Sequence, residues 1–62
     1  MRTYTMTMPS DLEKRKQVVE WLQHQGATDI GWDYELIFHF DKNKERDLID
    51  YCVKNDLNLR GW

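Results

Sequence analysis

Apolar and polar residues alternate in three parts of the chain. In residues 2–8, threonines occupy the odd positions, and an arginine, a tyrosine and two methionines occupy the even ones. From Ile30 to Phe40 every even residue is apolar, and near the C-terminus Leu57 and Leu59 alternate with polar residues. Because successive side chains of a β-strand point to opposite faces, each alternation predicts a strand with one buried face.

The middle alternation is too long to form one strand in a domain of this size. As a single strand, residues 28–40 would extend about 44 Å, whereas the expected radius of gyration of so short a chain is about 10–11 Å. We therefore predict a hairpin whose loop lies at residues 33–35. This loop pairs Trp32 with Leu36, and further along it pairs Ile30 with Phe38, so that all even residues share one face. The residues expected on that buried face are Trp32, Leu36, Phe38 and Phe40.

A helix is predicted between the first strand and the hairpin, over residues 11–25. Ser10 and Glu13 have the spacing of a capping box, which supplies acceptors to the free N–H groups of a helix start. Gly26 is expected to end the helix, because glycine readily adopts the left-handed conformation of a helix C-terminus. The apolar stripe of this helix consists of Leu12, Val18, Val19 and Leu22.

A second helix is predicted over residues 42–54 or 44–54, after the hairpin. Asp41 or Asn43 can cap its start, and Asn55 is expected to end it in the left-handed conformation. The apolar stripe of this helix consists of Leu48, Ile49, Cys52 and Val53.

The predicted elements follow the order strand, helix, strand, strand, helix, strand. This order resembles the split β-α-β arrangement of the ferredoxin-like fold, an α+β architecture in which two helices cover one face of a four-stranded antiparallel sheet. The resemblance implies that the first and third strands are central and that the second and fourth lie at the edges. Residues 1–62 are expected to form a single small domain.

The cysteine and glycine content argues against several kinds of site. The single cysteine, Cys52, cannot form an intramolecular disulfide, and one cysteine with two distant histidines is a poor set of zinc ligands. The three glycines match no phosphate-binding spacing. We therefore expect neither a metal nor a cofactor.

The charge and hydropathy patterns bear on partners and location. A net charge of −2 with interspersed signs argues against a strongly basic nucleic-acid binder and against an acidic DNA mimic. The first sixteen residues contain no apolar run of signal-peptide length, and no segment approaches the roughly 20 apolar residues that span a bilayer. We expect a cytoplasmic protein that does not bind membranes.

His39 is the residue with most catalytic potential, because a histidine can transfer protons near neutral pH. It lies on the predicted open face of the sheet, with the threonines of the first strand, and Asp41 could orient its ring. No serine or cysteine can be placed beside it. Cys52 falls in an apolar stripe, where burial would raise the pKa of its thiol. We therefore predict that the protein is not an enzyme.

Several aromatic residues fall outside the predicted core. Trp21 and Tyr51 lie on the flanks of the two helical stripes, and aromatic and arginine side chains often anchor protein interfaces. An alternative is that these two rings pack against each other between the helices. The predicted partner-binding residues are Trp21, Tyr34, Tyr51, Arg60 and Trp62.

These features predict a small protein-interaction module, a regulator or inhibitor that binds a larger protein partner or forms a homodimer. The shortness of the chain resembles that of small accessory proteins of phages and mobile elements. The alternative is a weak nucleic-acid-binding protein that uses basic residues at both helix starts. Those residues are Lys14, Arg15, Lys16, Lys42 and Lys44.

Overall fold

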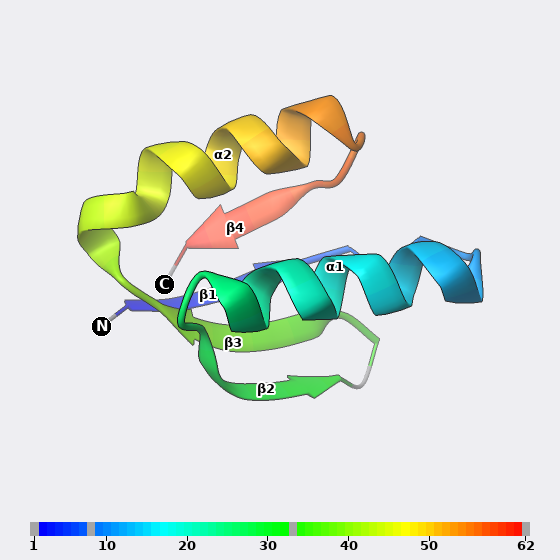
Figure 1. Ribbon diagram of the computed structural model, residues 1–62, viewed down its shortest axis with the longest axis horizontal. Coiled ribbons are helices and arrows are strands. Elements are labelled where there is room, and N and C mark those ends of the chain that lie inside the picture. The colour runs from blue at the N-terminus through cyan, green and yellow to red at the C-terminus, as the bar shows by residue number, and fades with distance from the viewer. Residues whose placement is uncertain (1, 8, 33, 62) are drawn as a thin grey trace.

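Four antiparallel strands and two α-helices make up the computed structural model, which describes residues 2–7, 9–32 and 34–61 (Figure 1). The elements are β1 (Arg2–Met6), α1 (Leu12–His24), β2 (Thr28–Trp32), β3 (Leu36–Phe40), the short 3₁₀ helix η1 (Lys42–Lys44), α2 (Glu45–Lys54) and β4 (Leu59–Gly61). The predicted α+β class is confirmed. Met8, Asp33 and Trp62, which carry predictions above, lie outside the described residues.

The strands lie in the order β2-β3-β1-β4, so that β2 and β4 are the edges of the sheet. Tyr4 of β1 lies opposite Phe38 of β3 on one side and opposite Gly61 of β4 on the other. The hairpin pairs Trp32 with Leu36, as predicted.

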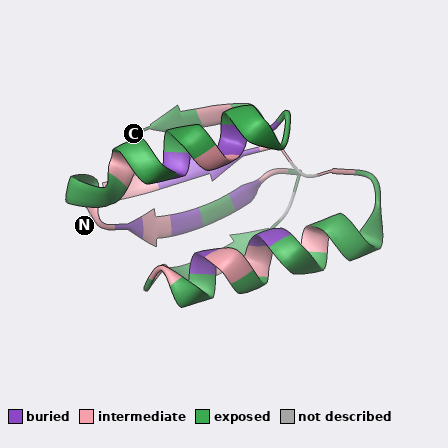
Figure 2. Ribbon diagram, turned by 45° about the horizontal axis from the view of Figure 1, so that its top comes forward, coloured by how far each residue is buried: buried purple, intermediate pink, exposed green. Residues whose placement is uncertain are grey.

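The core lies between one face of the sheet and the two helices. Figure 2 shows buried positions along β1 and β3 and on both helices. The even residues of the two central strands are buried there because the strand period of two keeps them on one face. The sheet and the segment before β4 contribute Tyr4, Met6, Leu36, Phe38, Phe40 and Leu57 to the core, and the helices contribute Val18, Leu22, Leu48 and Cys52.

The start of α1 differs from the prediction by one residue. Asp11, not Ser10, is the N-cap: its side chain accepts a hydrogen bond of 3.0 Å from the backbone N–H of Glu13. A carboxylate in this position also interacts favourably with the helix dipole, which gives Asp11 an advantage over a serine hydroxyl. At the other end Gly26 has a φ of +87°, and the predicted glycine terminus is confirmed.

The second helical segment begins with η1, and α2 continues it. The side chain of Asp41 caps η1 by accepting a hydrogen bond of 2.9 Å from the backbone N–H of Asn43. The predicted left-handed terminator is wrong, because Asn55 has a φ of −105° and uses its side-chain amide to donate to the Tyr51 carbonyl. The left-handed residue is Asp56, with a φ of +56°.

A β-bulge interrupts β2. The regular ladder that the alternation predicts shifts between Gly31, opposite Ile37, and Thr28, opposite His39. Asp29 lies inside the shift and has a φ of +52°, in the left-handed region that aspartate tolerates better than most residues. The regular pairing of Ile30 with Phe38 is therefore not a feature of this hairpin.

The predicted burial is wrong for several residues. Trp32 is 58 % exposed, because it ends an edge strand. Leu12 is exposed because the first turn of α1 extends past the end of the sheet (Figure 1). Conversely, Thr5 is only 4 % exposed although it lies on the open face, because it sits on a central strand between Ile37 and Arg60.

Candidate protein-interaction site

Large apolar side chains gather at two separate places on the surface, and Ile37 lies apart from both on the open face of the sheet. In the part of the chain that the structure describes, those with the greatest exposure fall at the β2–β3 turn with the start of α1, and along one side of α2. The exposed large hydrophobic residues are Leu12, Trp32, Tyr34, Ile37, Ile49 and Val53. Exposed apolar groups that gather in one place often mark binding surfaces.

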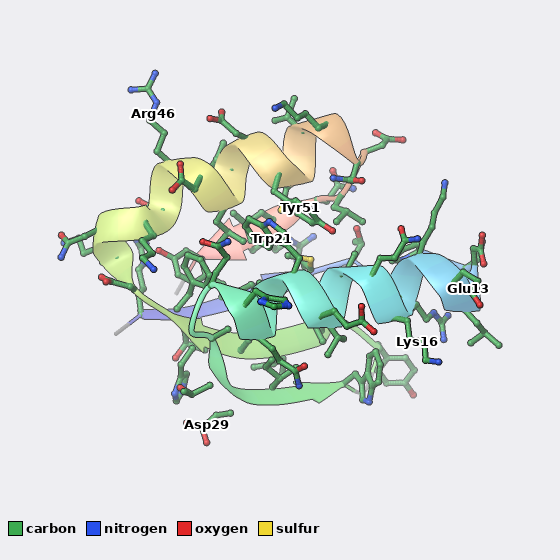
Figure 3. All side chains as sticks on the ribbon, viewed as in Figure 1. Glu13, Lys16, Trp21, Asp29, Arg46 and Tyr51 are labelled. Carbon is green, nitrogen blue, oxygen red and sulfur yellow. The ribbon has the colours of Figure 1, made fainter. Side chains whose placement is uncertain are left out.

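We call the first place the hairpin-end surface; it comprises Leu12, Trp32 and Tyr34. Tyr34 is 93 % exposed and follows the last residue of β2, Trp32, by two positions. Figure 1 shows the β2–β3 turn at the same end of the molecule as the first turn of α1. Lys16 projects from α1 at this end (Figure 3). Two aromatic rings, a leucine and a lysine can therefore meet one partner.

The second place is an open groove of about 580 Å³ between α2 and β4. Glu45 is one of its lining residues, and the Oε1 atom of Glu45 accepts hydrogen bonds from the Tyr4 hydroxyl (3.1 Å) and from Arg2 Nη1 (3.3 Å). Burial, and then the hydrogen bond that the Tyr4 hydroxyl donates to Glu45, raises the pKa of Tyr4. The apolar part of the groove is lined by Ile49, Cys52, Val53, Leu57 and Leu59.

Trp21 and Tyr51, two of the predicted partner-binding residues, contact each other. Their rings are stacked with centroids 3.9 Å apart and planes 11° from parallel, and Trp21 also stacks on Phe40 at 6.3 Å. Both rings are half-buried against the core, and desolvation, followed by the proximity of Cys52, raises the pKa of Tyr51. The two rings thus pack against each other, as in the alternative given above. A role of the two rings in partner binding stays a prediction.

The structure does not bring the remaining predicted partner-binding residues together. Tyr34 lies at the turn beside one edge of the sheet, whereas Arg60 lies on β4 at the other edge, opposite Thr5 on the open face. Trp62 lies outside the described residues. Among the described residues of this predicted set, Tyr34 is the most exposed aromatic side chain.

The predicted nucleic-acid-binding residues form two groups at opposite ends of the molecule. Lys14, Arg15 and Lys16 lie near the start of α1, and Lys42 and Lys44 lie in η1, which precedes α2; Figure 1 shows these two helix starts far apart. Two of the five side chains also make local contacts: Arg15 Nε donates to the Pro9 carbonyl at 2.6 Å, and Lys44 Nζ donates to that of Gln25 at 3.4 Å.

His39 has a different partner from the predicted one. Its Nδ1 atom lies 2.9 Å from Oδ2 of Asp29, whereas Asp41 is engaged in capping η1. The sequence pattern placed Asp41 near His39 by its spacing of two, but the bulge brings Asp29 closer. This pair is not part of a metal site, because among the described residues no third His, Cys, Asp or Glu joins it.

Cys52 is buried, as predicted, and burial raises the pKa of its thiol to about 11. The thiolate is the reactive form of cysteine, so this side chain is unreactive at neutral pH. It packs in the core as a small apolar group.

Sequence reasoning missed four exposed surface residues: Leu12, Trp32, Ile49 and Val53. The regular alternation predicted that Trp32 is buried, although a position beside a turn is a signal of reduced burial. The width of the apolar stripe of α2 was also a signal of partial exposure. The stripe has four members, and only Leu48 and Cys52 are buried. The other two members are left facing the groove.

No protein-family model matches the chain, and neither curated proteins nor solved structures show a significant similarity to it. Of the helices that the structure describes, none is long and apolar enough to cross a membrane.

Proposed function

We propose that this protein is a small, non-enzymatic interaction module that regulates or inhibits a larger protein partner by binding it through the hairpin-end surface. The observation that carries the proposal is the exposure of two aromatic rings at one turn, Trp32 and Tyr34. Rings of this kind bury a large apolar area on binding and lose little conformational freedom, which is why they dominate the energetics of many interfaces.

The arrangement around these rings supports the same function. Leu12 adds apolar area at the same end, and Lys16 supplies a polar rim. The rings lie on a hairpin that the core holds through Leu36 and Phe38, so the surface is supported by rigid elements. Binding therefore requires little ordering of β3, and little of the interaction free energy is lost to it.

We also infer that the fold is ferredoxin-like. The order of elements and the strand order β2-β3-β1-β4 support this inference. That topology hosts many unrelated functions, so it adds no argument about the partner. A cytoplasmic location, where a lone reduced cysteine is stable, fits the same proposal.

Capture of partners from a native lysate tests the proposed function. Tagged wild-type protein is compared with Trp32→Ser/Tyr34→Ser, each with and without nuclease treatment. We expect a protein retained at near-stoichiometric level by the wild type after nuclease, and lost with the double variant. The matched control is Ile37→Ser, which changes an exposed apolar residue on the open face of the sheet and should retain the partner.

The same experiment separates the alternative function. If nuclease removes all captured material and Lys14→Glu/Lys16→Glu prevents capture while the aromatic variant does not, the protein binds nucleic acid and the proposal is wrong. Phosphate contacts are also weakened steeply by salt, so the captured material would then be released as the salt concentration rises. Circular dichroism of each variant confirms that loss of capture does not reflect unfolding.

A further inference from the structure

The two edges of the sheet differ in their ability to accept another strand. The edge strand β2 carries the bulge between Thr28 and Gly31, with Asp29 in a left-handed conformation. Bulges of this kind hinder the pairing of an edge strand with another chain. The other edge strand, β4, pairs with β1 in a regular register, and no described strand lies on its outer side. The β4 edge can therefore accept a strand, and its length of 3 residues limits it to a short segment.

The backbone of β4 directs hydrogen-bonding groups away from the sheet. The Thr7 N–H donates to the Asn58 carbonyl at 3.0 Å, and the Asn58 N–H donates to the Thr7 hydroxyl at 3.0 Å. The backbone polar groups of Asn58 thus face β1. Because this direction alternates along an antiparallel strand, the N–H and C=O groups of Leu59 and Gly61 face outward. A segment that pairs with these two residues leaves the β1–β4 ladder intact.

The open groove of about 580 Å³ lies beside this edge, between β4 and α2. Ile49 and Val53 line its α2 side and are 45 % and 74 % exposed. Leu59 lines its β4 side and is paired with Met6, whose side chain is buried in the core. A strand added to β4 would direct every second side chain into this groove. Aliphatic side chains at those positions would bury apolar surface against α2.

Arg60 sets a charge requirement on the other side of such a strand. It lies between Leu59 and Gly61, and it is paired with Thr5, so its side chain lies on the open face of the sheet. Arg60 is exposed and has no ion-pair partner among the described residues. Opposite charges that face each other on neighbouring strands attract, whereas like charges repel. An acidic side chain is therefore complementary to the position opposite Arg60.

We propose that the β4 edge and the adjoining groove bind an extended segment of a partner protein as an additional strand of the sheet. The segment runs antiparallel to β4, as neighbouring strands do throughout this sheet. It has an acidic residue opposite Arg60, and the aliphatic residues on either side of it lie opposite Leu59 and Gly61 and face the groove. In strand addition the backbone hydrogen bonds supply affinity, and the alternate side chains supply specificity.

A blocked pentapeptide, Thr-Val-Glu-Val-Thr, tests strand addition by NMR titration of the labelled protein. It should shift the amide signals of Leu59 and Gly61 and slow the hydrogen exchange of their N–H groups, with a Kd of about 1 mM or below. Methylation of the backbone nitrogen of the second valine removes the donor to the Leu59 carbonyl and should abolish binding. Absence of binding by the first peptide, or equal binding of the methylated one, overturns the proposal.

Exchange of charges tests the pairing with Arg60. A peptide with lysine in place of glutamate should bind the wild type at least about threefold more weakly, and Arg60→Glu should reverse this preference. The matched control is Lys16→Glu, which makes the same change of charge on α1 and should leave the preference unaltered. If Arg60→Glu binds both peptides equally, the acidic residue of the segment does not lie opposite Arg60 and the proposed pairing is wrong.

Substitution of Val53 tests the contact with the groove. Val53→Glu should weaken peptide binding at least about fivefold, because it places a carboxylate against the aliphatic side chains of the segment. Leu12→Glu should bind normally, since Leu12 has the same 74 % exposure but lies on α1; equal effects of the two variants would contradict the proposed site. Trp32→Ser/Tyr34→Ser, the variant that tests the proposed function, should also bind the peptide normally. The two sites lie at opposite edges of the sheet, so the two proposals can fail independently.

Discussion

The indole of Trp21 and the phenol ring of Tyr51 are stacked 3.9 Å apart, and they join the two helices above the sheet (Figure 3). Trp21 comes from α1 and Tyr51 from α2, and the indole also stacks on Phe40 of β3. One side chain thus connects both helices and a central strand. In so small a domain, where one thin core must offset the entropy of the whole chain, this contact is a large share of the packing between the helices.

Removal of the indole should therefore destabilise the fold. We expect Trp21→Ala to lower the free energy of unfolding by about 3 kcal/mol, measured by urea denaturation. Tyr51→Phe keeps the stacked ring and should change the stability by less than about 0.5 kcal/mol. If instead Trp21→Ala retains wild-type stability and abolishes partner capture, Trp21 belongs to the interface, as its position on the helix flank predicts.

Thr5 offers a change that should stabilise the protein. Its hydroxyl oxygen is buried and has no hydrogen-bond partner among the described residues. Because an unsatisfied buried polar group costs free energy, Thr5→Val should raise the free energy of unfolding by about 1 kcal/mol. Thr3→Val, on the same strand and face but more exposed, should change it much less. A loss of stability in Thr5→Val would show that the hydroxyl is satisfied in solution.

Stability should fall at alkaline pH. Burial raises the pKa of Cys52 from 9.0 to about 11, so the folded state holds the thiol proton more tightly than the unfolded state. The resulting stabilisation is fully present below pH 9.0 and is lost as the pH rises toward 11. The raised pKa values of Tyr4 and Tyr51 act in the same direction. Urea denaturation at a series of pH values measures the decline, which should be shallower in Cys52→Ala.

Asp29 combines a left-handed backbone with an ion pair to His39, and substitutions can separate the two contributions. Asp29→Ala should lower the free energy of unfolding by about 1 kcal/mol or more, since alanine adopts the left-handed conformation poorly and provides no carboxylate. Asp29→Gly removes the strain of the left-handed backbone. Its stability should be close to that of the wild type, because exposed ion pairs contribute only about 0–1 kcal/mol. Thermal denaturation of both variants measures the difference; equal losses would mean that the carboxylate, and not the backbone, matters here.

Features that depend on local chemistry were predictable from the sequence. The alternation along the central strands correctly places Tyr4, Met6, Leu36, Phe38 and Phe40 in the core, because the strand period is a property of the backbone. Gly26 marks the end of α1 for an equally local reason, since few other residues accept its positive φ.

Features that depend on contacts between distant elements were not predictable in this way. The exposure of Trp32 follows from its place at the end of β2, which is an edge strand. The pairing of His39 with Asp29 requires a bulge, and nothing in the alternation from Ile30 onward signals one. The separation of the basic residues into two groups depends on the direction in which the two helices run (Figure 1). Each of these three features becomes visible only when the complete fold is known.

The bulge at Asp29 also limits how many copies of such a sheet could pair edge to edge. Protomers with two regular edges can add further protomers on both sides, and the product is a fibre of no fixed length. A protomer with one regular edge uses that edge in its first pairing and offers the next chain only an irregular one. The extra residue in β2 thereby removes one of the two regular edges that open-ended polymerisation of this small protein would require.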